Sequence, residues 1–191
     1  MPIAGVDEAG RGPLAGPVVA GAVILDPIAP LSGLKDSKKL TAKQREKLFD
    51  LIYMHAVSVG VAVVEPIIID KINILQASLQ AMQLAVAQLK IKPKTILIDG
   101  NQAPFFDKKY IVKTIIGGDD IEPAISAASV IAKVTRDRIM VAYEKEYPGY
   151  GFAAHKGYPT ASHKAALLTL GVSPIHRLSF APVRKAMLEF A

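Results

Sequence analysis

The feature that most constrains the fold is an uninterrupted run of β-branched and small apolar residues from Val18 to Leu25. Such a run predicts a strand that is buried inside a sheet. From Val57 to Val63, valines alternate with small residues at the two-residue period of a strand. Further short apolar segments are expected to add strands to the same sheet: Ile3 to Val6, Thr95 to Ile98 and Tyr110 to Ile116.

Helices are expected between and after these strands. Thr41 to Gln44 has the sequence of a capping box, which predicts a helix running to about Tyr53. Apolar residues recur at helical spacing from Leu75 to Leu89, so this segment is expected to form an amphipathic helix. Three more helices are expected: one from Ala124 to Tyr147 behind Pro123, one from Thr160 to Leu170, and one from Ala181 to Phe190.

This order of elements predicts an α/β fold with a mixed central β-sheet flanked by helices over residues 1–147. Residues 148–191 are expected to form a small C-terminal helical extension packed on that domain, in a single compact unit. A hydrophobic content of 51% indicates a well-packed core rather than a disordered chain.

Composition narrows the classes of function. The chain has no cysteine, which excludes disulfides, thiolate metal ligands and a cysteine nucleophile. A net charge of +6 makes an anionic partner such as nucleic acid plausible, although many basic proteins bind none. Neither a signal peptide nor a membrane-spanning segment is visible, so no membrane partner and a cytoplasmic location are expected.

Acidic residues stand where the predicted strands end, and they are the main candidates for chemistry: Asp7, Glu8, Asp99 and Asp119. For any one of them, an ordinary turn is the more common explanation, because Asp suits turns. Acids at several strand ends instead favour one shared site at a sheet edge. Carboxylates without softer ligands suit Mg²⁺ or Mn²⁺, and two such ions ~3.5–4 Å apart are a standard device for attack on a phosphodiester.

The glycine-rich segment from Gly10 to Pro17 follows the first acids. Its glycine spacing excludes a P-loop, and it either lets a ligand approach the backbone or makes a tight connection between strands. The segment from Asp36 to Leu40 precedes a capped helix, a good place for a phosphate or simply a solvated surface. Ser126, Ser129, Lys133 and Arg136 form a polar stripe that could line a groove or face water.

A basic and aromatic cluster runs from His155 to His163 and contains Tyr158. A tyrosine among cations is typical of a platform for a sugar or base, although it is also common in turn packing. A second such segment runs from His176 to Val183. The four histidines show no metal-ligand spacing, so no zinc site is expected.

Together these segments closely resemble the ribonuclease HII family. The resemblance runs in family order from residue 5 to about residue 183, and its first block is very specific. The matching stretches are Gly5–Val18, Leu34–Leu40, Ile98–Asn101, Ser126–Asp137, His155–Tyr158 and His176–Phe180.

The resemblance implies an RNase H-like fold and an endonuclease that cuts the RNA strand of RNA–DNA hybrids. It also implies cleavage 5′ to ribonucleotides embedded in duplex DNA, leaving 3′-hydroxyl and 5′-phosphate ends. Its implied cofactor is Mn²⁺ or Mg²⁺, held by Asp7, Glu8, Asp99 and Asp119. Gly10-Arg11-Gly12 resembles the element that senses the ribose 2′-hydroxyl in this family. Tyr158 resembles the residue that stacks on the deoxyribose side of the junction between RNA and DNA.

Substrate contacts are expected from residues near each motif. We expect phosphate-driven binding that is indifferent to base sequence, with Lys39 also contributing. The predicted substrate-binding residues are Gly10, Arg11, Gly12, Ser37, Lys38, Lys133, Arg136, Lys156 and Tyr158.

The sequence departs from the family pattern in two places, and two alternative functions remain. Gly117 stands where relatives often have lysine, and Asp120 could replace Asp119 as the fourth ligand. No motif for docking on a sliding clamp is visible, and a monomer is expected. A type III ribonuclease H would carry a long N-terminal domain, for which Asp7 leaves no room. A non-catalytic protein that binds RNA–DNA hybrids is the alternative of a different class, and it would not need all four acids.

Overall fold

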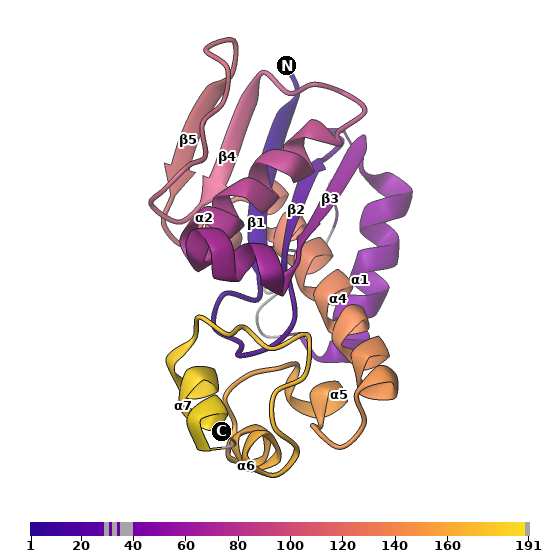
Figure 1. Cartoon of the computed structure of the whole chain (residues 1–191). Helices are drawn as coiled ribbons and strands as arrows, with labels where there is room; N and C mark the ends of the chain where they lie inside the picture. Colours follow the sequence, from indigo (N-terminus) through magenta and orange to yellow (C-terminus); the bar gives the residue numbers. More distant parts are fainter. Residues whose placement is uncertain (29–30, 32–33, 35–39, 190–191) are drawn as a thin grey trace.

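The computed structural model describes residues 1–28, 31, 34 and 40–189. Its centre is a five-stranded sheet in the order β3-β2-β1-β4-β5 (Figure 1). The strands are β1 (Ile3–Ala9), β2 (Val18–Ile24), β3 (Ser58–Val64), β4 (Thr95–Asp99) and β5 (Ile111–Ile115). Each predicted strand is therefore present, and β1 continues past its predicted end at Val6 to Ala9.

The sheet is mixed, as predicted. β2 pairs antiparallel with β1 and β3, whereas β4 pairs parallel with β1 and β5. The carboxyl ends of β1, β4 and β5 therefore meet at one edge of the sheet, which faces the C-terminal helices (Figure 1). Loops after parallel strands gather at such an edge, and sites commonly form there.

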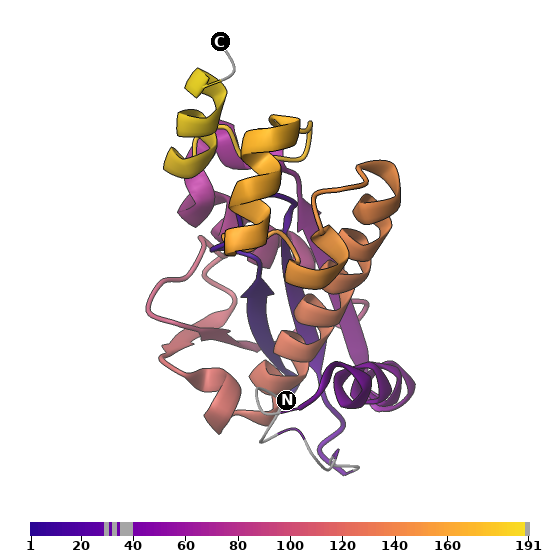
Figure 2. The same cartoon turned by 90° about the horizontal axis from the view of Figure 1, so that it is seen from below.

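Helices cover both faces of the sheet (Figures 1 and 2). One face packs against α2 (Pro66–Ala87), and the other packs against α1 (Ala42–His55) and α4 (Pro123–Glu146). β2 lies between these layers and every one of its residues is buried, which explains its continuous apolar sequence.

Helix α4 lies unusually close to β1. Gly5 has no side chain, and a Cβ there would overlap the backbone of Ala124 in α4. Gly21, the β2 partner of Asp7, is packed in the same way against Ala128. Alternate residues of a strand share a face, so Asp7 points to the same helix as Gly5. The sequence thus brings the first acid directly against α4.

Helix α2 differs from its prediction. It begins at Pro66, earlier than the apolar spacing indicated, and its helical conformation is broken at Asn73, where φ is 67°. The Asn73 side chain accepts a hydrogen bond of 3.1 Å from the Gln76 amide, so it caps the second half. That second half is the amphipathic segment that the spacing predicted.

The other predicted helices are confirmed, and two single turns were missed. The capping box at Thr41 is present, with reciprocal hydrogen bonds to Gln44. Thr160 caps α6 as expected. Four residues carry no periodicity, which is why the turns α3 and α5 were not predicted. The remaining helices are α3 (Gly118–Ile121), α5 (Phe152–His155), α6 (Ala161–Leu170) and α7 (Ala181–Glu189).

The C-terminal helices lie beyond the sheet edge at which β1 and β4 end (Figure 1). Backbone hydrogen bonds of 2.8 Å tie them to the first loop, residues 10–17: Leu14 donates to Gly157, Gly16 donates to Ile175, and Arg177 donates to Leu14. The extension therefore packs on the loop that follows the first acids. The division at residues 147 and 148 stays a prediction.

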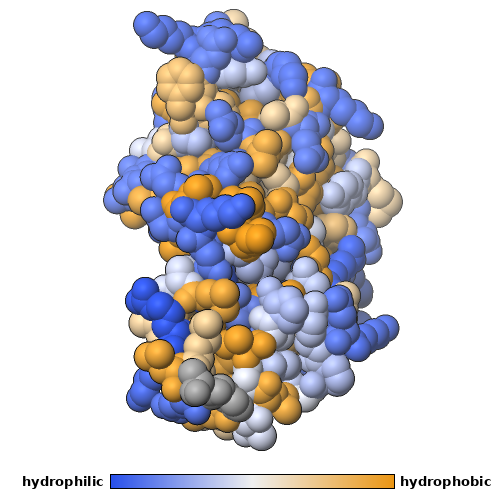
Figure 3. All heavy atoms as spheres, in the orientation of Figure 1, coloured by the Kyte–Doolittle hydropathy of each residue, from blue (hydrophilic) through white to orange (hydrophobic). Residues whose placement is uncertain are grey.

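In the orientation of Figure 3, apolar side chains on the visible surface lie scattered between hydrophilic ones. Among the residues that the structure describes, no helix is both long and apolar enough to cross a membrane.

Candidate active site

Neighbouring strands bring acidic side chains to one edge of the sheet. Asp7 and Glu8 lie near the end of β1, and Asp99 is the last residue of the adjacent β4. The amide of Gly118 donates a hydrogen bond of 2.7 Å to Asp99 Oδ1, and Asp119 is the next residue. The fold thus brings the segments that carry all four predicted acids to the same edge.

The short helix α3 buries one of the two consecutive acids that follow Gly118 and exposes the other. Asp119 is 3% exposed, whereas Asp120 is exposed to solvent. Gly117 caps this turn with φ 66°, a left-handed conformation that glycine adopts without strain. This conformation gives a physical reason for glycine at residue 117. Burial beside the Asp99 contact favours Asp119 as the fourth acid.

Burial and neighbouring negative charge raise the pKa of the two acids on β1. Burial raises the pKa of Asp7 well above its usual value, the charges of Glu8 and Asp99 raise it further, and a hydrogen bond from Ser129 lowers it. Burial also raises the pKa of Glu8, while Arg11, at 3.3 Å, lowers it. Crowded negative charge of this kind costs stability unless cations neutralise it.

The donor set suits hard cations. Every candidate side chain offers carboxylate oxygens, which are the ligands that Mg²⁺ and Mn²⁺ prefer. In the described part of the chain, no group of three acidic or histidine side chains is already arranged to hold an ion. The acids therefore fit such ions by chemistry, burial and charge.

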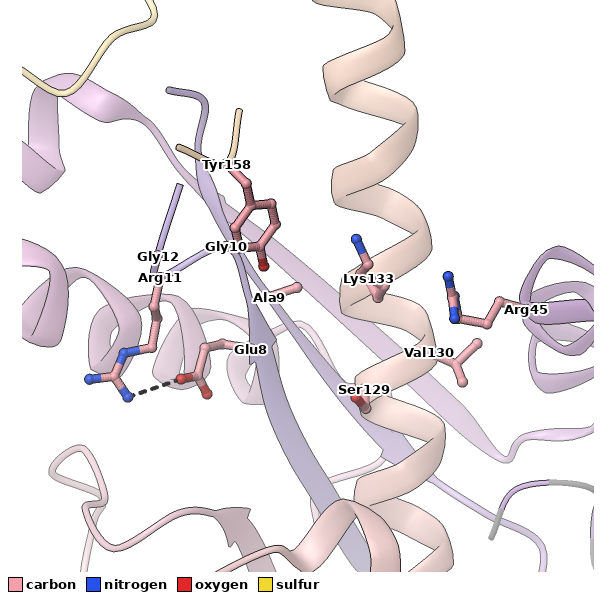
Figure 4. A pocket seen from close by; sticks show the side chains of 10 residues that line it. All are labelled: Glu8, Ala9, Gly10, Arg11, Gly12, Arg45, Ser129, Val130, Lys133 and Tyr158. Atoms are coloured by element: carbon pink, nitrogen blue, oxygen red, sulfur yellow. Dashed lines mark hydrogen bonds and ion pairs between the residues drawn. The ribbon is translucent and has the colours of Figure 1, made fainter. Parts of the chain in front are cut away.

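A cavity of about 450 Å³ opens beside Glu8 (Figure 4). One wall is the end of β1 with the first loop, and the opposite wall is the face of α4. Arg45 reaches in from α1, and the Tyr158 ring projects from the C-terminal extension (Figure 4). The lining residues are Glu8, Ala9, Gly10, Arg11, Gly12, Arg45, Ser129, Val130, Lys133 and Tyr158.

The two glycines of the first loop have different surroundings. Gly10 is buried with φ +100°, and a Cβ there would overlap the side chain of Arg136. Gly12 is exposed, its φ lies outside the left-handed region, and its nearest neighbour for a Cβ would be Tyr158 Cε1 at an ordinary 3.6 Å. The fold therefore requires glycine at residue 10, whereas no neighbour among the described residues requires it at residue 12.

Histidines hold the backbone on both sides of Tyr158. His163 Nδ1 donates to the Tyr158 carbonyl at 2.9 Å, because a carbonyl can only accept. His163 Nε2 must then accept from His176 Nε2 at 3.1 Å, and His176 Nδ1 accepts from the Ser173 amide at 2.9 Å. His155 Nδ1 accepts from the Gly157 amide at 3.1 Å. This chain of hydrogen bonds requires neutral imidazoles.

The histidine chain predicts a loss of stability in acid. Burial, together with the smaller effect of the neighbouring His163, lowers the pKa of His176 to about 4. Because the unfolded protein binds the proton more tightly, the stability that neutral His176 contributes is lost as pH falls from about 6.5 to about 4. The loss is about 3 kcal/mol in the free energy of unfolding. Urea unfolding at pH 7 and pH 4 measures it.

A variant separates the effect of His176 from that of Asp7 and Glu8. The raised pKa values of these acids increase the stability of the folded protein as pH falls. His176→Gln has no titrating ring, so between pH 7 and pH 4 its free energy of unfolding should fall less than that of the parent, or rise. His55→Gln, at the exposed end of α1, should leave the dependence unchanged. Equal pH dependence in the parent and His176→Gln would contradict the assignment.

The structure corrects the prediction that Arg136 binds substrate. Its side chain is 1% exposed and donates to the backbone carbonyls of Ala15, Pro17 and Lys156. Lys156 is partly buried outside the cavity lining, and its ammonium group bonds the Ala153 carbonyl.

The other predicted contacts divide into two groups. Ser37, Lys38 and Lys39 lie outside the described residues. Gly10, Arg11, Gly12, Lys133 and Tyr158 all line the cavity. Of the polar stripe on α4, Ser129 and Lys133 line the cavity while Ser126 is buried.

Two polar residues of the cavity, Arg45 and Ser129, were absent from the predicted site. Arg45 lies in the first turns of α1, where the helix dipole disfavours a cation. Lys43 shares that helix start, so the sequence carried no signal that singles out Arg45. Ser129 was noted only as part of a stripe, and its bond to Asp7 depends on how closely α4 approaches β1.

Known proteins share this fold and sequence. The family model for ribonuclease HII matches residues 4–183. Ribonuclease HII of Nitrosococcus oceani is 55% identical over 183 residues, which is 96% of this chain and 90% of the relative. The crystal structure of ribonuclease H2 from Pyrococcus horikoshii has a TM-score of 0.81 and 32% identity, and the match covers 100% of this chain and 99% of that one.

A more distant structure shares the fold alone. Bst-RNase HIII in complex with Mn²⁺ has a TM-score of 0.77 and 19% identity, over 98% of this chain and 70% of that one. These neighbours confirm the predicted RNase H-like fold. The chain therefore belongs to the ribonuclease HII family, and it is a hydrolytic endonuclease of the ribonuclease H type.

Proposed function

We propose that the protein hydrolyses the RNA strand of RNA–DNA hybrids and cuts 5′ to ribonucleotides embedded in duplex DNA. The observation that carries this proposal is the combination of four acids at one sheet edge with a cavity walled by Gly12 and Tyr158. Water attacks phosphorus and the bond to the 3′-oxygen breaks, so the products carry 3′-hydroxyl and 5′-phosphate ends.

Asp7, Glu8, Asp99 and Asp119 would hold Mn²⁺ or Mg²⁺. When bound, two such ions supply an activated water and stabilise the charge that develops on the leaving oxygen. The raised pKa values of Asp7 and Glu8 support this assignment, because a cluster that is costly alone is relieved by cations. The Mn²⁺ named for the Bst-RNase HIII structure supports the same class of ion.

The rest of the cavity would select and orient the substrate. The exposed backbone at Arg11 and Gly12 can approach a ribose 2′-hydroxyl, the only group that marks RNA at a given sugar. The Tyr158 ring, 42% exposed, would pack on the neighbouring deoxyribose. Lys133 and Arg45 line the opposite side and would contact phosphates.

The non-catalytic alternative explains these features less well. A protein that only bound a polyanion would gain nothing from acids crowded beside its cationic wall, because they repel phosphate and destabilise the fold. Binding of divalent cations, in contrast, would explain why the acids are crowded together.

The substrate preference of Tyr158→Ala tests the proposal. Loss of the ring should reduce cleavage of a duplex with one embedded ribonucleotide by about tenfold or more, as expected for a stacking contact. A continuous hybrid should be affected much less, because only the isolated ribonucleotide depends on the junction. Tyr158→Phe should retain most activity on both substrates.

A purely structural role for Tyr158 predicts a different result. Both substrates would then lose activity equally, together with a lowered melting temperature. Tyr147→Ala, which removes another aromatic ring at the end of α4, serves as the control and should leave the ratio of the two rates unchanged.

A further inference from the structure

Two arginines are buried behind the first loop. Arg177 is 0% exposed and Arg136 is 1% exposed, and they are the two largest fully buried side chains of the described residues. Burial lowers the pKa of Arg177 to about 9 and that of Arg136 to about 10, so both remain charged at neutral pH. Burying a charge is costly, and keeping two side by side calls for a reason.

Both guanidinium groups are used to hold backbone carbonyls. Together they donate seven hydrogen bonds, and every acceptor is a backbone carbonyl oxygen. Within the described residues, neither side chain forms an ion pair with a carboxylate at contact distance. The acceptors are the carbonyls of Gly10, Arg11, Ala15, Gly16, Pro17 and Lys156.

Arg177 holds the two carbonyls that matter most for the cavity. It donates to the Gly10 carbonyl at 2.6 Å and to the Arg11 carbonyl at 3.0 Å. These peptide bonds are trans and planar, so the N–H of each unit points opposite to its C=O. The N–H groups that share these units belong to Arg11 and Gly12, and they must point away from the buried guanidinium.

That direction is the open side of the loop. Arg11 and Gly12 are exposed and line the cavity, whereas Gly10 is buried. In the described part of the chain, neither the Arg11 nor the Gly12 amide donates to another protein group. Two amides with a fixed direction and no internal acceptor form a preorganised pair of donors.

We propose that Arg177 is a positioning residue that aims the Arg11 and Gly12 amides at the ribose 2′-hydroxyl, while Arg136 holds the far end of the loop. This inference rests on the proposed function, because it assigns to the same cavity the recognition of a ribonucleotide. It explains why a residue of the C-terminal extension is buried against a loop 160 or more positions earlier in the chain. It also explains why Arg136 is buried, which a role in contacting phosphate would not explain.

Holding these carbonyls requires the planar guanidinium group of arginine, which carries several N–H donors in fixed directions. A single guanidinium reaches Gly10, Arg11, Gly16 and Pro17 at once, in one plane. Lysine keeps the charge but offers one mobile ammonium group, so it cannot hold both the Gly10 and the Arg11 carbonyl in place. Arg177→Lys therefore separates geometry from charge.

The test measures binding without divalent ions, so that it does not depend on cleavage. Two duplexes of identical sequence are compared, one with a single ribonucleotide and one of DNA alone. In the parent protein, the ribonucleotide duplex should bind more tightly. In Arg177→Lys this preference should fall by about tenfold, the worth of one or two hydrogen bonds. Affinity for the all-DNA duplex should stay within about twofold, because it depends on surface cations.

Two controls exclude a merely structural effect. Leu167→Ala removes a buried side chain of α6 and should lower the melting temperature without changing the preference. Arg138→Lys alters an exposed arginine paired with Glu46 and should change neither quantity. In the ¹⁵N spectrum of the free protein, Arg177→Lys should shift the Arg11 and Gly12 amide signals, whereas Arg138→Lys should not.

The outcomes are distinct. A preference that survives in folded Arg177→Lys overturns the inference, as does a loss that Leu167→Ala reproduces at equal stability. If Arg177→Lys does not fold, Arg177→Gln is tested on the same pair of duplexes, because its amide can still donate to carbonyls without a buried charge. A parent protein with no preference between the duplexes contradicts the proposed function instead.

Discussion

Asp99→Asn is expected to lose cleavage by about a thousandfold or more, because several kcal/mol of charge stabilisation depend on the metal that its carboxylate would hold. The fold should survive the change. Asp99 Oδ1 accepts the Gly118 amide at 2.7 Å, and the amide oxygen of asparagine can accept the same bond. Binding of a hybrid duplex should likewise persist, because Lys133 and Arg45 are unaffected. Single-turnover cleavage and a binding titration measure the two effects separately.

The same variant has a thermal signature. Asp99 is one of the charges that raise the pKa of Asp7, so removing it relieves repulsion within the acidic cluster. Without divalent ions, Asp99→Asn should melt at the same temperature as the parent or higher. Addition of Mn²⁺ should stabilise the parent and have little effect on the variant.

The neighbouring acid provides the control for Asp99→Asn. Asp120→Asn alters the exposed acid beside Asp119 and should retain both cleavage and stabilisation by Mn²⁺. Substantial cleavage by Asp99→Asn, or loss of cleavage by Asp120→Asn, would show that the ligand set is wrong.

Gly12→Ala should lose roughly a hundredfold in cleavage while remaining as stable as the parent, because a small misplacement of the reacting groups costs about that much. The added methyl group would lie 3.6 Å from Tyr158 Cε1 and meet no other atom of the described residues within 4 Å. It would occupy the space through which a ribose must approach the Arg11 and Gly12 amides. Cleavage rates and a melting curve of this variant check both parts.

The other glycine of the loop gives the matched contrast. Gly10→Ala would place its methyl group in the Arg136 side chain at φ +100°, so it should destabilise the protein markedly. The account predicts that one variant loses function and the other loses stability. Full activity in Gly12→Ala would refute the idea that the sugar approaches the backbone there.

Local patterns carried most of the fold prediction. The run at Val18 and the alternation after Val57 each predicted a strand, and the capping box at Thr41 predicted a helix start, because these signals are complete within a few residues. The break at Asn73 was missed because a left-handed residue inside an apolar helix leaves no periodic trace.

Only part of the candidate site could be predicted from the sequence. The acids could be predicted as candidates because strand ends are local signals, and Tyr158 because cationic residues surround it in the sequence. The role of Arg136 was misjudged, since helical spacing cannot tell a groove from an interior filled by a distant loop. The partnership of Arg177 with Gly10 and Arg11 spans the whole chain, so no local pattern could have shown it.

The most direct measurement is to map the cut in an end-labelled DNA duplex that contains one ribonucleotide, in the presence of Mn²⁺ or Mg²⁺. The account predicts a single break on the 5′ side of the ribonucleotide, with 3′-hydroxyl and 5′-phosphate ends and no cleavage when the ions are chelated. A break on the 3′ side with a cyclic phosphate would mean that the 2′-hydroxyl attacks rather than being recognised, and it would contradict the account. The account would equally be contradicted if the protein bound the duplex but failed to cut it in the presence of either Mn²⁺ or Mg²⁺.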